Sequence, residues 1–525
     1  MFTKLKFLFI KNNASSVDEY IASKKQGDVH LKQGRMDDAL ACYRHSLSLN
    51  PHYVDALIGL GYILSEREQY LPAKENLLLA LSVDSKAHDA HYILGTIAAK
   101  RHDLPGAIEH FAHAIDAKPD FEFAYRDLHG ALLQSGDVLQ LKKVIETAIS
   151  VFPNSAEFQF YLSTMLADEE QYPQAIASYR KTLSMQPDSA LAHKNLAELL
   201  GKCGQPEQAI DSYQAALRFE PTLVDAQIGL GNVLETLGRV TEAVASYRSA
   251  TVLKPGDAVA HQYLGNALLK LNATREALAC FETVVKLDPV NPIVHLVAAL
   301  SGRDTDHPPY DYVKRLFDQY ADKFDSHLVK ALDYRTPEEL ARLLQTCAEP
   351  DAQNWRVLDL GCGTGLFGVA VAPFAQQLVG VDLSRKMLEQ ARALDIYHRL
   401  EEADLHVMMQ SEATASFDVV SATDVFIYVG KLDELLIEVR RLLRPGGYFA
   451  FSAESLEAYA DAEAGRGQRR DFLLASSGRY VHSIAYLDRL AALNGFEILT
   501  VSESKIRLEK GKPLQGYLLV WRRQQ

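Results

Sequence analysis

Small and large apolar residues recur every 34 residues between Tyr20 and Asn291, eight times without an insertion or deletion. Position 20 of the unit is alanine in seven of the eight units, and position 32 is proline in seven of the eight. Position 24 is large and apolar throughout: Tyr43, Leu77, Phe111, Ile145, Tyr179, Tyr213, Tyr247 and Phe281. Small residues let two helices approach closely, and proline ends a helix before the next unit begins. The pattern predicts eight stacked helix pairs, in which the large residues fill the space between units.

This pattern resembles the tetratricopeptide repeat family over residues 20–291, with residues 1–19 as a lead-in. The resemblance implies an all-α superhelix whose groove binds a protein partner or substrate. The family's groove positions are here occupied by Asp28, Tyr62, Tyr92, Arg126, Lys194, Asn232 and Asn266. Asn232 and Asn266 share position 9 of successive units, so they are either two rungs of an asparagine ladder that grips a peptide or two solvated polar residues. The solvated interpretation is favoured.

The composition of the chain disfavours several classes of function. The 525 residues carry a formal net charge of −13, which disfavours binding to nucleic acid because that affinity comes from lysine and arginine on phosphates. The five cysteines have no paired spacing, so we expect reduced thiols in the cytoplasm and no metal site. No segment approaches the roughly eighteen apolar residues of a membrane span. The sequence leaves the oligomeric state open.

The 34-residue pattern stops after Asn291, and a second kind of pattern follows. The segment SGRDTDHPPYD (residues 301–311) predicts a linker, and an amphipathic helix is expected from Tyr312. Residues 292–350 are therefore assigned to the linker and the helices after it, and residues 351–525 to a second domain.

The second domain begins with a strand, a glycine-rich turn and a helix. The run WRVLDL ends at Leu360, GCGTG follows at once, and a second strand over 378–381 ends in Asp382. Such a βαβ unit holds a nucleoside, because glycines let the backbone approach the ligand and the acid accepts hydrogen bonds from ribose hydroxyls. Gly363, Gly365 and Gly368 also match the G-x-G-x-x-G pattern of nicotinamide and flavin enzymes.

Further motifs separate these two ligand classes. DLGCGTG, LSRKMLEQAR after Asp382, FDVV at 417–420, LLRPGGYFAFS at 442–452 and two final strands that fit an antiparallel hairpin occur in order. With them, residues 310–525 resemble class I S-adenosylmethionine-dependent methyltransferases. The segments YDYVKRLFDQYADKF, SATDVFIYVGKL and GRYVHSIAYLDRLAALNGF are similar to bacterial predicted methyltransferases that contain tetratricopeptide repeats. The implied fold is a Rossmann-like α/β domain with a seven-stranded sheet.

The resemblance also implies a role for individual residues. Those expected to bind S-adenosyl-L-methionine are Asp359, Gly361, Cys362, Gly363 and Gly365 at the methionine part, Asp382 at the ribose, Leu383, Met387, Asp404 and Leu405 at the adenine, Thr423 beside the transferred methyl group, and Tyr320 and Arg335 in a covering segment. Those expected near the acceptor are Asp424, Tyr428 and His482. His482 has a competing interpretation as a structural residue beside a late helix.

Three functions remain open at this point, apart from a nicotinamide oxidoreductase, which is the most distant alternative and rests on the G-x-G-x-x-G match alone. The first is a methyltransferase whose repeats recruit a protein, either as the substrate or as the adaptor for one. The second is a methyltransferase for a metabolite, lipid or quinone precursor that uses its repeats for assembly. The third is a scaffold without catalysis, which the intact glycines and Asp382 disfavour. The acceptor atom, the partner and the need for a base are not defined by the sequence.

Overall fold

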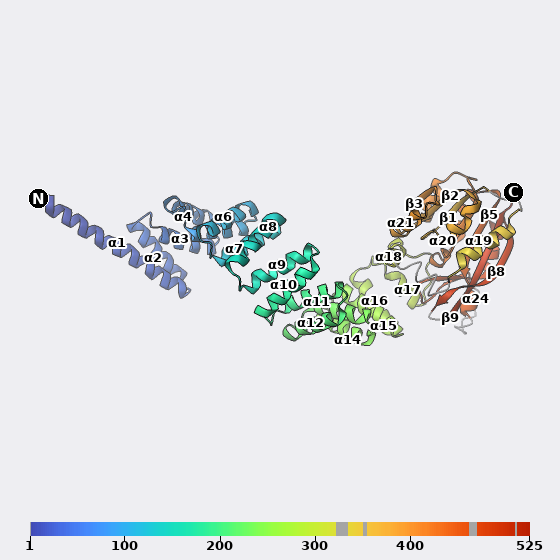
Figure 1. The fold of residues 1–525 in the computed structure, drawn as a ribbon, viewed down its shortest axis with the longest axis horizontal. Coiled ribbons are helices and arrows are strands. Elements are labelled where there is room, and N and C mark those ends of the chain that lie inside the picture. The colour runs from blue at the N-terminus through green and yellow to red at the C-terminus, as the bar shows by residue number, and fades with distance from the viewer. Residues whose placement is uncertain (1, 322–333, 350–353, 461–469, 510–511) are drawn as a thin grey trace. The chain divides into compact units, whose positions relative to one another are not determined.

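The computed structural model describes residues 2–321, 334–349, 354–460, 470–509 and 512–525 (Figure 1). The chain divides into two compact units, Met1–Arg239 and Val240–Gln525. The second unit therefore contains the last helices of the repeat pattern together with the α/β domain. None of the helices in the described part of the chain is long and apolar enough to cross a lipid bilayer.

The first unit consists of antiparallel helices that follow the predicted period. They are α1 (Phe2–Lys32), α2 (Met36–Leu49), α3 (Val54–Glu66), α4 (Tyr70–Val83), α5 (His88–Lys100), α6 (Leu104–Ala117), α7 (Glu122–Ser135), α8 (Val138–Val151), α9 (Ala156–Asp168), α10 (Tyr172–Met185), α11 (Ala190–Lys202), α12 (Pro206–Phe219) and α13 (Val224–Thr236). In the second unit, the pattern continues through α14 (Val240–Leu253), α15 (Ala258–Lys270) and α16 (Thr274–Leu287). The prediction of an all-α repeat region is confirmed.

Large side chains at position 24 pack where a neighbouring helix has no Cβ atom. A Cβ added at Gly27, in the same unit as Tyr43, would lie 2.7 Å from the Tyr43 ring. A Cβ added at Gly59, in the next unit, would also lie 2.7 Å from that ring. Tyr43 therefore fills the space between units, as predicted, and also the space within its own helix pair.

The α/β domain is built on a seven-stranded sheet in the order β3-β2-β1-β4-β5-β9-β8, and a separate two-stranded sheet pairs β6 with β7. The strands are β1 (Trp355–Leu360), β2 (Ala375–Asp382), β3 (Arg399–Glu402), β4 (Phe417–Ala422), β5 (Leu443–Glu454), β6 (Phe472–Leu474), β7 (Tyr480–His482), β8 (Phe496–Glu509) and β9 (Lys512–Arg523). Strands β1 to β5 are parallel, and β9 runs antiparallel between β5 and β8. The predicted fold class, the strands predicted at WRVLDL, 378–381, FDVV and LLRPGGYFAFS, and the terminal hairpin are confirmed.

Helices cover both faces of this sheet, which explains why its central strands are apolar along their whole length. Leu358 of β1 belongs to one buried cluster, with α23 and α25, whereas Val357 belongs to the other, with α19 and α20. The helices and short 3-10 segments of the domain are α18 (Tyr310–Tyr320), α19 (Thr336–Cys347), α20 (Leu366–Val371), η3 (Ala372–Phe374), α21 (Arg385–Ala393), α22 (Leu405–Ser411), η4 (Phe426–Tyr428), α23 (Asp433–Leu442), α24 (Leu456–Ala460) and α25 (Ile484–Leu493).

The predicted linker packs against the α/β domain. Helix α17 (Val294–Leu300) precedes it, and the buried His295 of that helix bonds through Nε2 to the carbonyl oxygen of Gly478 at 3.0 Å. The carbonyl oxygen of Asp306 accepts hydrogen bonds from the amides of Gly430 and Lys431, both at 3.0 Å. Residues 301–309 therefore have no regular secondary structure, as predicted, whereas Tyr310 and Asp311 already belong to α18, and the segment is held at several points along its length.

We expect Gly95→Ala to destabilise the repeat array by about 1–3 kcal/mol, because the new Cβ would overpack the helix pair α5–α6. A Cβ at Gly95 would lie 2.6 Å from the Phe111 ring. The measurement is the urea midpoint of the first unfolding transition, followed by far-ultraviolet circular dichroism.

Gly130→Ala is the matched control, since a Cβ at Gly130 of α7 would meet no heavy atom within 4 Å. This variant should gain about 0.5–1 kcal/mol from helix propensity alone. Equal midpoints for the two variants would show that the close approach at Gly95 does not limit stability.

Candidate active site

The candidate site lies at the carboxyl ends of the parallel strands, where the strand order reverses between β1 and β4. This is where open α/β sheets place their ligands. The cavity there has a volume of about 1490 Å³. One wall comes from the loop after β1 and from the ends of β2 and β3, and the other comes from the end of β4 and from β8.

The glycine loop after β1 has a backbone that favours glycine. Gly361, Gly363 and Gly365 have φ angles of 62°, 54° and 95°. These values lie in the left-handed region, which a residue with a Cβ enters only at a cost. A Cβ at Gly361 would also lie 2.6 Å from Val425. Glycine is therefore required in this loop by the backbone conformation and, at Gly361, by the packing of Val425.

Two buried carboxyl groups flank this loop. Asp382, at the end of β2, accepts hydrogen bonds from the amide of Gly363 at 3.0 Å and from that of Ser384 at 2.8 Å. Asp359, in β1, accepts one from the Tyr397 hydroxyl at 2.7 Å and one from the Ser421 hydroxyl at 2.8 Å. Each carboxylate oxygen has a second lone pair, so both groups can still accept a hydrogen bond from a ligand.

Burial raises the pKa of Asp359 to about 6 and that of Asp382 to about 6. Burial disfavours the charged form of an acid, and the hydrogen bonds offset only part of that cost. Both groups are therefore mainly ionised at pH 7 and become protonated within about one pH unit below 6.

The opposite wall carries a buried ion-pair network. Arg507 of β8 donates through Nη1 to Oδ2 of Asp424 at 2.9 Å and through Nη2 to Oε1 of Glu454. The Ser452 hydroxyl donates to Oδ1 of Asp424 at 2.9 Å and accepts from the Asp424 amide at 2.8 Å. Arg479 also pairs with Glu454, with Nε 3.5 Å from Oε1, so two arginines face the two carboxylates and these side chains hold one another in place.

Asp424 is also held in an unusual backbone conformation. Its φ angle is 57°, in the left-handed region that costs a residue other than glycine about 1–3 kcal/mol. The bonds from its amide to Ser452 and from its carboxylate to Arg507 maintain this conformation. Beside it, Oγ1 of Thr423 is buried and has no hydrogen-bond partner in the part of the chain that the structure describes.

The structure brings most of the predicted residues to one cavity. Those that line it are Asp359, Gly361, Cys362, Gly363, Asp382, Leu383, Asp404, Leu405, Thr423, Asp424 and Tyr428. Gly365 belongs to the same loop but does not line the cavity. Met387 is fully buried in α21 and is not part of the lining.

Of the remaining predicted residues, two lie outside the cavity lining, and the side chain of the third is not described. Arg335 is exposed at the start of α19 and is not part of the lining. The side chain of Tyr320 lies outside the described residues. His482 is completely buried in β7 and bonds through Nε2 to the carbonyl oxygen of Gly430 at 2.9 Å. Burial lowers the pKa of His482 to about 4, so the placement matches the structural interpretation rather than a role beside the acceptor.

Other cavity residues were not expected from the sequence. Arg507 and Arg479 line the cavity, as do the residues of the former linker from Arg303 to Pro309. A bulge between Lys505 and Arg507 shifts the register of β8 against β9, so strict alternation along the strand does not predict that Arg507 points inward. The two prolines of the linker predict a break in helical structure, but they do not predict that the linker forms a wall of the cavity.

The repeat region has a smaller hollow of its own. It has a volume of about 470 Å³ and contains the predicted groove residues Asp28, Tyr62 and Tyr92. Arg126, also predicted there, makes a two-pronged ion pair with Glu157 at 2.7 to 3.0 Å. The first three units thus offer a hollow with aromatic and acidic walls.

Comparison with known proteins assigns both regions. Residues 332–501 match the family model described as a methyltransferase domain. Residues 24–71, 66–120, 131–190, 166–222 and 194–258 match one tetratricopeptide repeat model, and residues 259–291 match another.

Relatives with assigned activities are similar to the α/β domain. The chain is 32% identical over 139 residues to malonyl-[acyl-carrier protein] O-methyltransferase of Legionella pneumophila, which covers 25% of this chain and 45% of that protein. It is 30% identical over 158 residues to ubiquinone biosynthesis O-methyltransferase of Aromatoleum aromaticum, a match that covers 28% of this chain and 67% of that protein. A solved S-adenosylmethionine-dependent methyltransferase from Mesorhizobium loti is 25% identical, with a TM-score of 0.27. The match covers 35% of this chain and 96% of that one.

The matched segment spans between about half and two thirds of the length of these two O-methyltransferases. The segment that matches the methyltransferase-domain model contains the glycine loop and Asp382, and the segments that match the repeat models contain the helix pairs. The chain belongs to the methyltransferase-domain family and carries an array of tetratricopeptide repeats before that domain.

Proposed function

We propose that this chain is an S-adenosylmethionine-dependent methyltransferase that methylates an oxygen atom of an acceptor brought by a protein bound to the repeats. The observation that carries the proposal is the single cavity at the carboxyl ends of β1, β2 and β4, where the glycine loop and Asp382 face Thr423 and Asp424. The five free cysteines are consistent with a reducing, cytoplasmic location.

The residues present fit the proposed cofactor. Gly361, Cys362 and Gly363 of the glycine loop line the cavity, so their backbone is accessible to a ligand. Asp382 has lone pairs left for the two ribose hydroxyls, and the unpartnered Oγ1 of Thr423 can bond to the ligand. Pockets for one ligand measure roughly 300–1,000 Å³. The cavity of about 1490 Å³ thus leaves room for an acceptor beside the cofactor.

When bound, S-adenosylmethionine supplies a methyl group that its sulfonium makes electrophilic. The protein then has to hold the acceptor oxygen in line and receive its proton. Asp424 is the proposed proton acceptor, because it lines the cavity and its geometry is fixed by Ser452 and Arg507. Tyr428 lines the same side, and burial raises its pKa to about 12, so it acts as a neutral hydrogen-bond donor at pH 7.

The repeats supply the second half of the proposal. One relative is named for malonyl-[acyl-carrier protein], an acceptor that is attached to a protein, and another for ubiquinone biosynthesis. A docking array suits the first kind of acceptor, since an acyl group on a carrier arrives together with a protein surface. A free quinone precursor is the alternative, in which case the repeats serve assembly.

We expect cofactor affinity to fall below pH 6 and to depend on Asp382. The ionised carboxylate accepts hydrogen bonds from the ribose, so protonation of Asp382 and Asp359 weakens binding by up to about tenfold per pH unit for each group. Asp382→Asn should weaken binding at pH 7.5 by about ten- to a hundredfold and should have a shallower pH dependence. Isothermal titration of S-adenosylmethionine between pH 5 and 8 measures both effects.

The stability of the free protein should change in the opposite direction. Because the folded pKa of about 6 for both groups lies above the unfolded value, the folded state binds more protons between about pH 4 and 6. Their contribution to the free energy of unfolding therefore rises as the pH falls through 6, so weaker binding there is not a loss of fold. Asp395→Asn, on the turn after α21, is the control and should bind like the parent. Equal affinity for Asp382→Asn and Asp395→Asn would remove Asp382 from the site.

We expect Asp424→Asn to retain cofactor affinity within about threefold and to lose methyl transfer by about a hundredfold or more, as loss of a general base does. The assay is transfer of radiolabelled methyl from S-adenosylmethionine into a cell lysate, separated into proteins and small molecules. A variant with full transfer would show that Asp424 does not accept the proton.

The fragment 240–525, which is the second compact unit, separates the two roles of the repeats. It should bind the cofactor like the whole chain, because every residue of the cavity belongs to it. If a protein brings the acceptor, the fragment should lose labelling of that acceptor by tenfold or more in the same assay. Undiminished labelling of a small molecule would favour the free acceptor and leave the repeats to assembly.

A further inference from the structure

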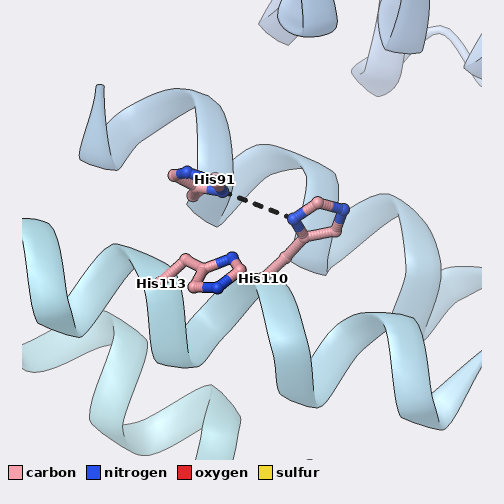
Figure 2. A group of neighbouring side chains, drawn as sticks. All are labelled: His91, His110 and His113. Atoms are coloured by element: carbon pink, nitrogen blue, oxygen red, sulfur yellow. Dashed lines mark hydrogen bonds between the residues drawn. The ribbon is translucent and has the colours of Figure 1, made fainter. Parts of the chain in front are cut away.

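Three histidines come together in the third repeat unit, in the docking array and not in the methyltransferase domain. His91 lies on α5, and His110 and His113 lie one turn apart on α6 (Figure 2). One imidazole nitrogen from each lies within 4.8 Å of one nitrogen from each of the others. The two helices form one hairpin, held by the packing of Phe111 on Gly95, so the three side chains share a rigid support.

The spacing of two of these nitrogens is that of metal ligands. Nδ1 of His91 and Nδ1 of His110 lie 3.4 Å apart. Two tetrahedral ligands about 2.0–2.1 Å from a zinc ion are separated by about 3.3–3.4 Å. The same distance is long for a hydrogen bond between nitrogens. His113 is exposed and free to rotate the remaining distance, and its ring centre lies 5.0 Å from that of His91.

A backbone hydrogen bond orients the first ligand. Nε2 of His91 lies 3.3 Å from the carbonyl oxygen of Ser85, so it carries the proton and leaves the lone pair of Nδ1 facing His110. Metal-binding histidines usually have such a bond on the second nitrogen, because it fixes the tautomer and the ring plane.

Two other repeat units show the same orienting bond without the other two histidines. His193 and His261 occupy the same repeat position as His91, and each bonds to a proline carbonyl at 3.0 Å. In those units the positions of His110 and His113 are held by Ser212 and Ala215 and by Cys280 and Thr283. The bond is thus a feature of the repeat, whereas the cluster of three is particular to the third unit among these.

We propose that the third repeat unit binds a divalent transition-metal ion, Zn²⁺ by its chemistry, through His91, His110 and His113. Three imidazoles suit zinc and neighbouring metals, whereas Mg²⁺ and Ca²⁺ prefer oxygen ligands. Three protein ligands leave the fourth position to water. Glu109 adds negative charge nearby and Lys74 adds positive charge, so the imidazoles provide the affinity. The proposal is independent of methyl transfer.

The test uses the whole chain, freed of metal with a chelator and then titrated with Zn²⁺ against a chromophoric competitor. We expect one equivalent to bind at micromolar protein concentration. Co²⁺ in place of Zn²⁺ should give the visible absorption of a tetrahedral site. Zn²⁺ should also raise the unfolding temperature of the repeat array, since it binds only the folded hairpin.

His110→Ala and His113→Ala should each lose the bound equivalent and the rise in unfolding temperature. His113→Cys should retain binding, because a thiolate replaces the imidazole and the exposed position carries no packing cost. His193→Ala is the matched control and should bind like the parent. The proposal is overturned if the parent binds zinc only at millimolar concentration, if His113→Ala keeps the metal, or if His193→Ala loses it.

Discussion

Close approach of the backbone at residues without a Cβ is the constraint on which both parts of this protein depend. In the repeats, Gly27 and Gly59 admit one tyrosine ring between three helices. In the α/β domain, the missing Cβ of Gly368 admits Tyr397, which then donates its hydroxyl hydrogen to Asp359. The stacking of the repeats and the position of Asp359 beside the glycine loop therefore both depend on residues that lack a Cβ atom.

Given that packing, the chemistry of the site comes from charges placed at strand ends. On one wall, two carboxyl groups are buried with few opposing charges, which raises their pKa. On the other wall, Asp424 and Glu454 share Arg507, so they are compensated as a set. Removing one member of such a set leaves a buried charge behind, whereas a ligand that bonds to the first wall relieves a cost already present. The first wall is thus suited to binding a ligand, and the second is suited to holding Asp424 in a fixed position.

Local patterns were enough to predict the elements of this fold but not all of its long-range contacts. Strands β1, β2, β4, β5, β8 and β9, the glycine loop and Asp382 follow from runs of residues that are contiguous in sequence, whereas the short strands β3, β6 and β7 were not predicted. Arg507 could not be predicted, because a bulge breaks the alternation of β8. His482 attracted interest as a titratable group near a late helix, yet only the fold shows that it is buried against Gly430. Of the histidines of the third unit, His110 and His113 lie three residues apart on α6, but His91 lies on the preceding helix, so the sequence alone does not show that the three come together.

The wall that the linker contributes to the cavity limits how the methyltransferase domain can be exchanged between proteins. The recognisable methyltransferase segment starts at residue 332 and ends at residue 501. The cavity, however, includes residues from Val294 to Phe317 and also Arg507. A gene fusion that exchanged only the recognisable segment would leave one side of the cavity behind. An intact cavity therefore requires the chain from Val294 to Arg507, which extends beyond both ends of the region that sequence similarity marks.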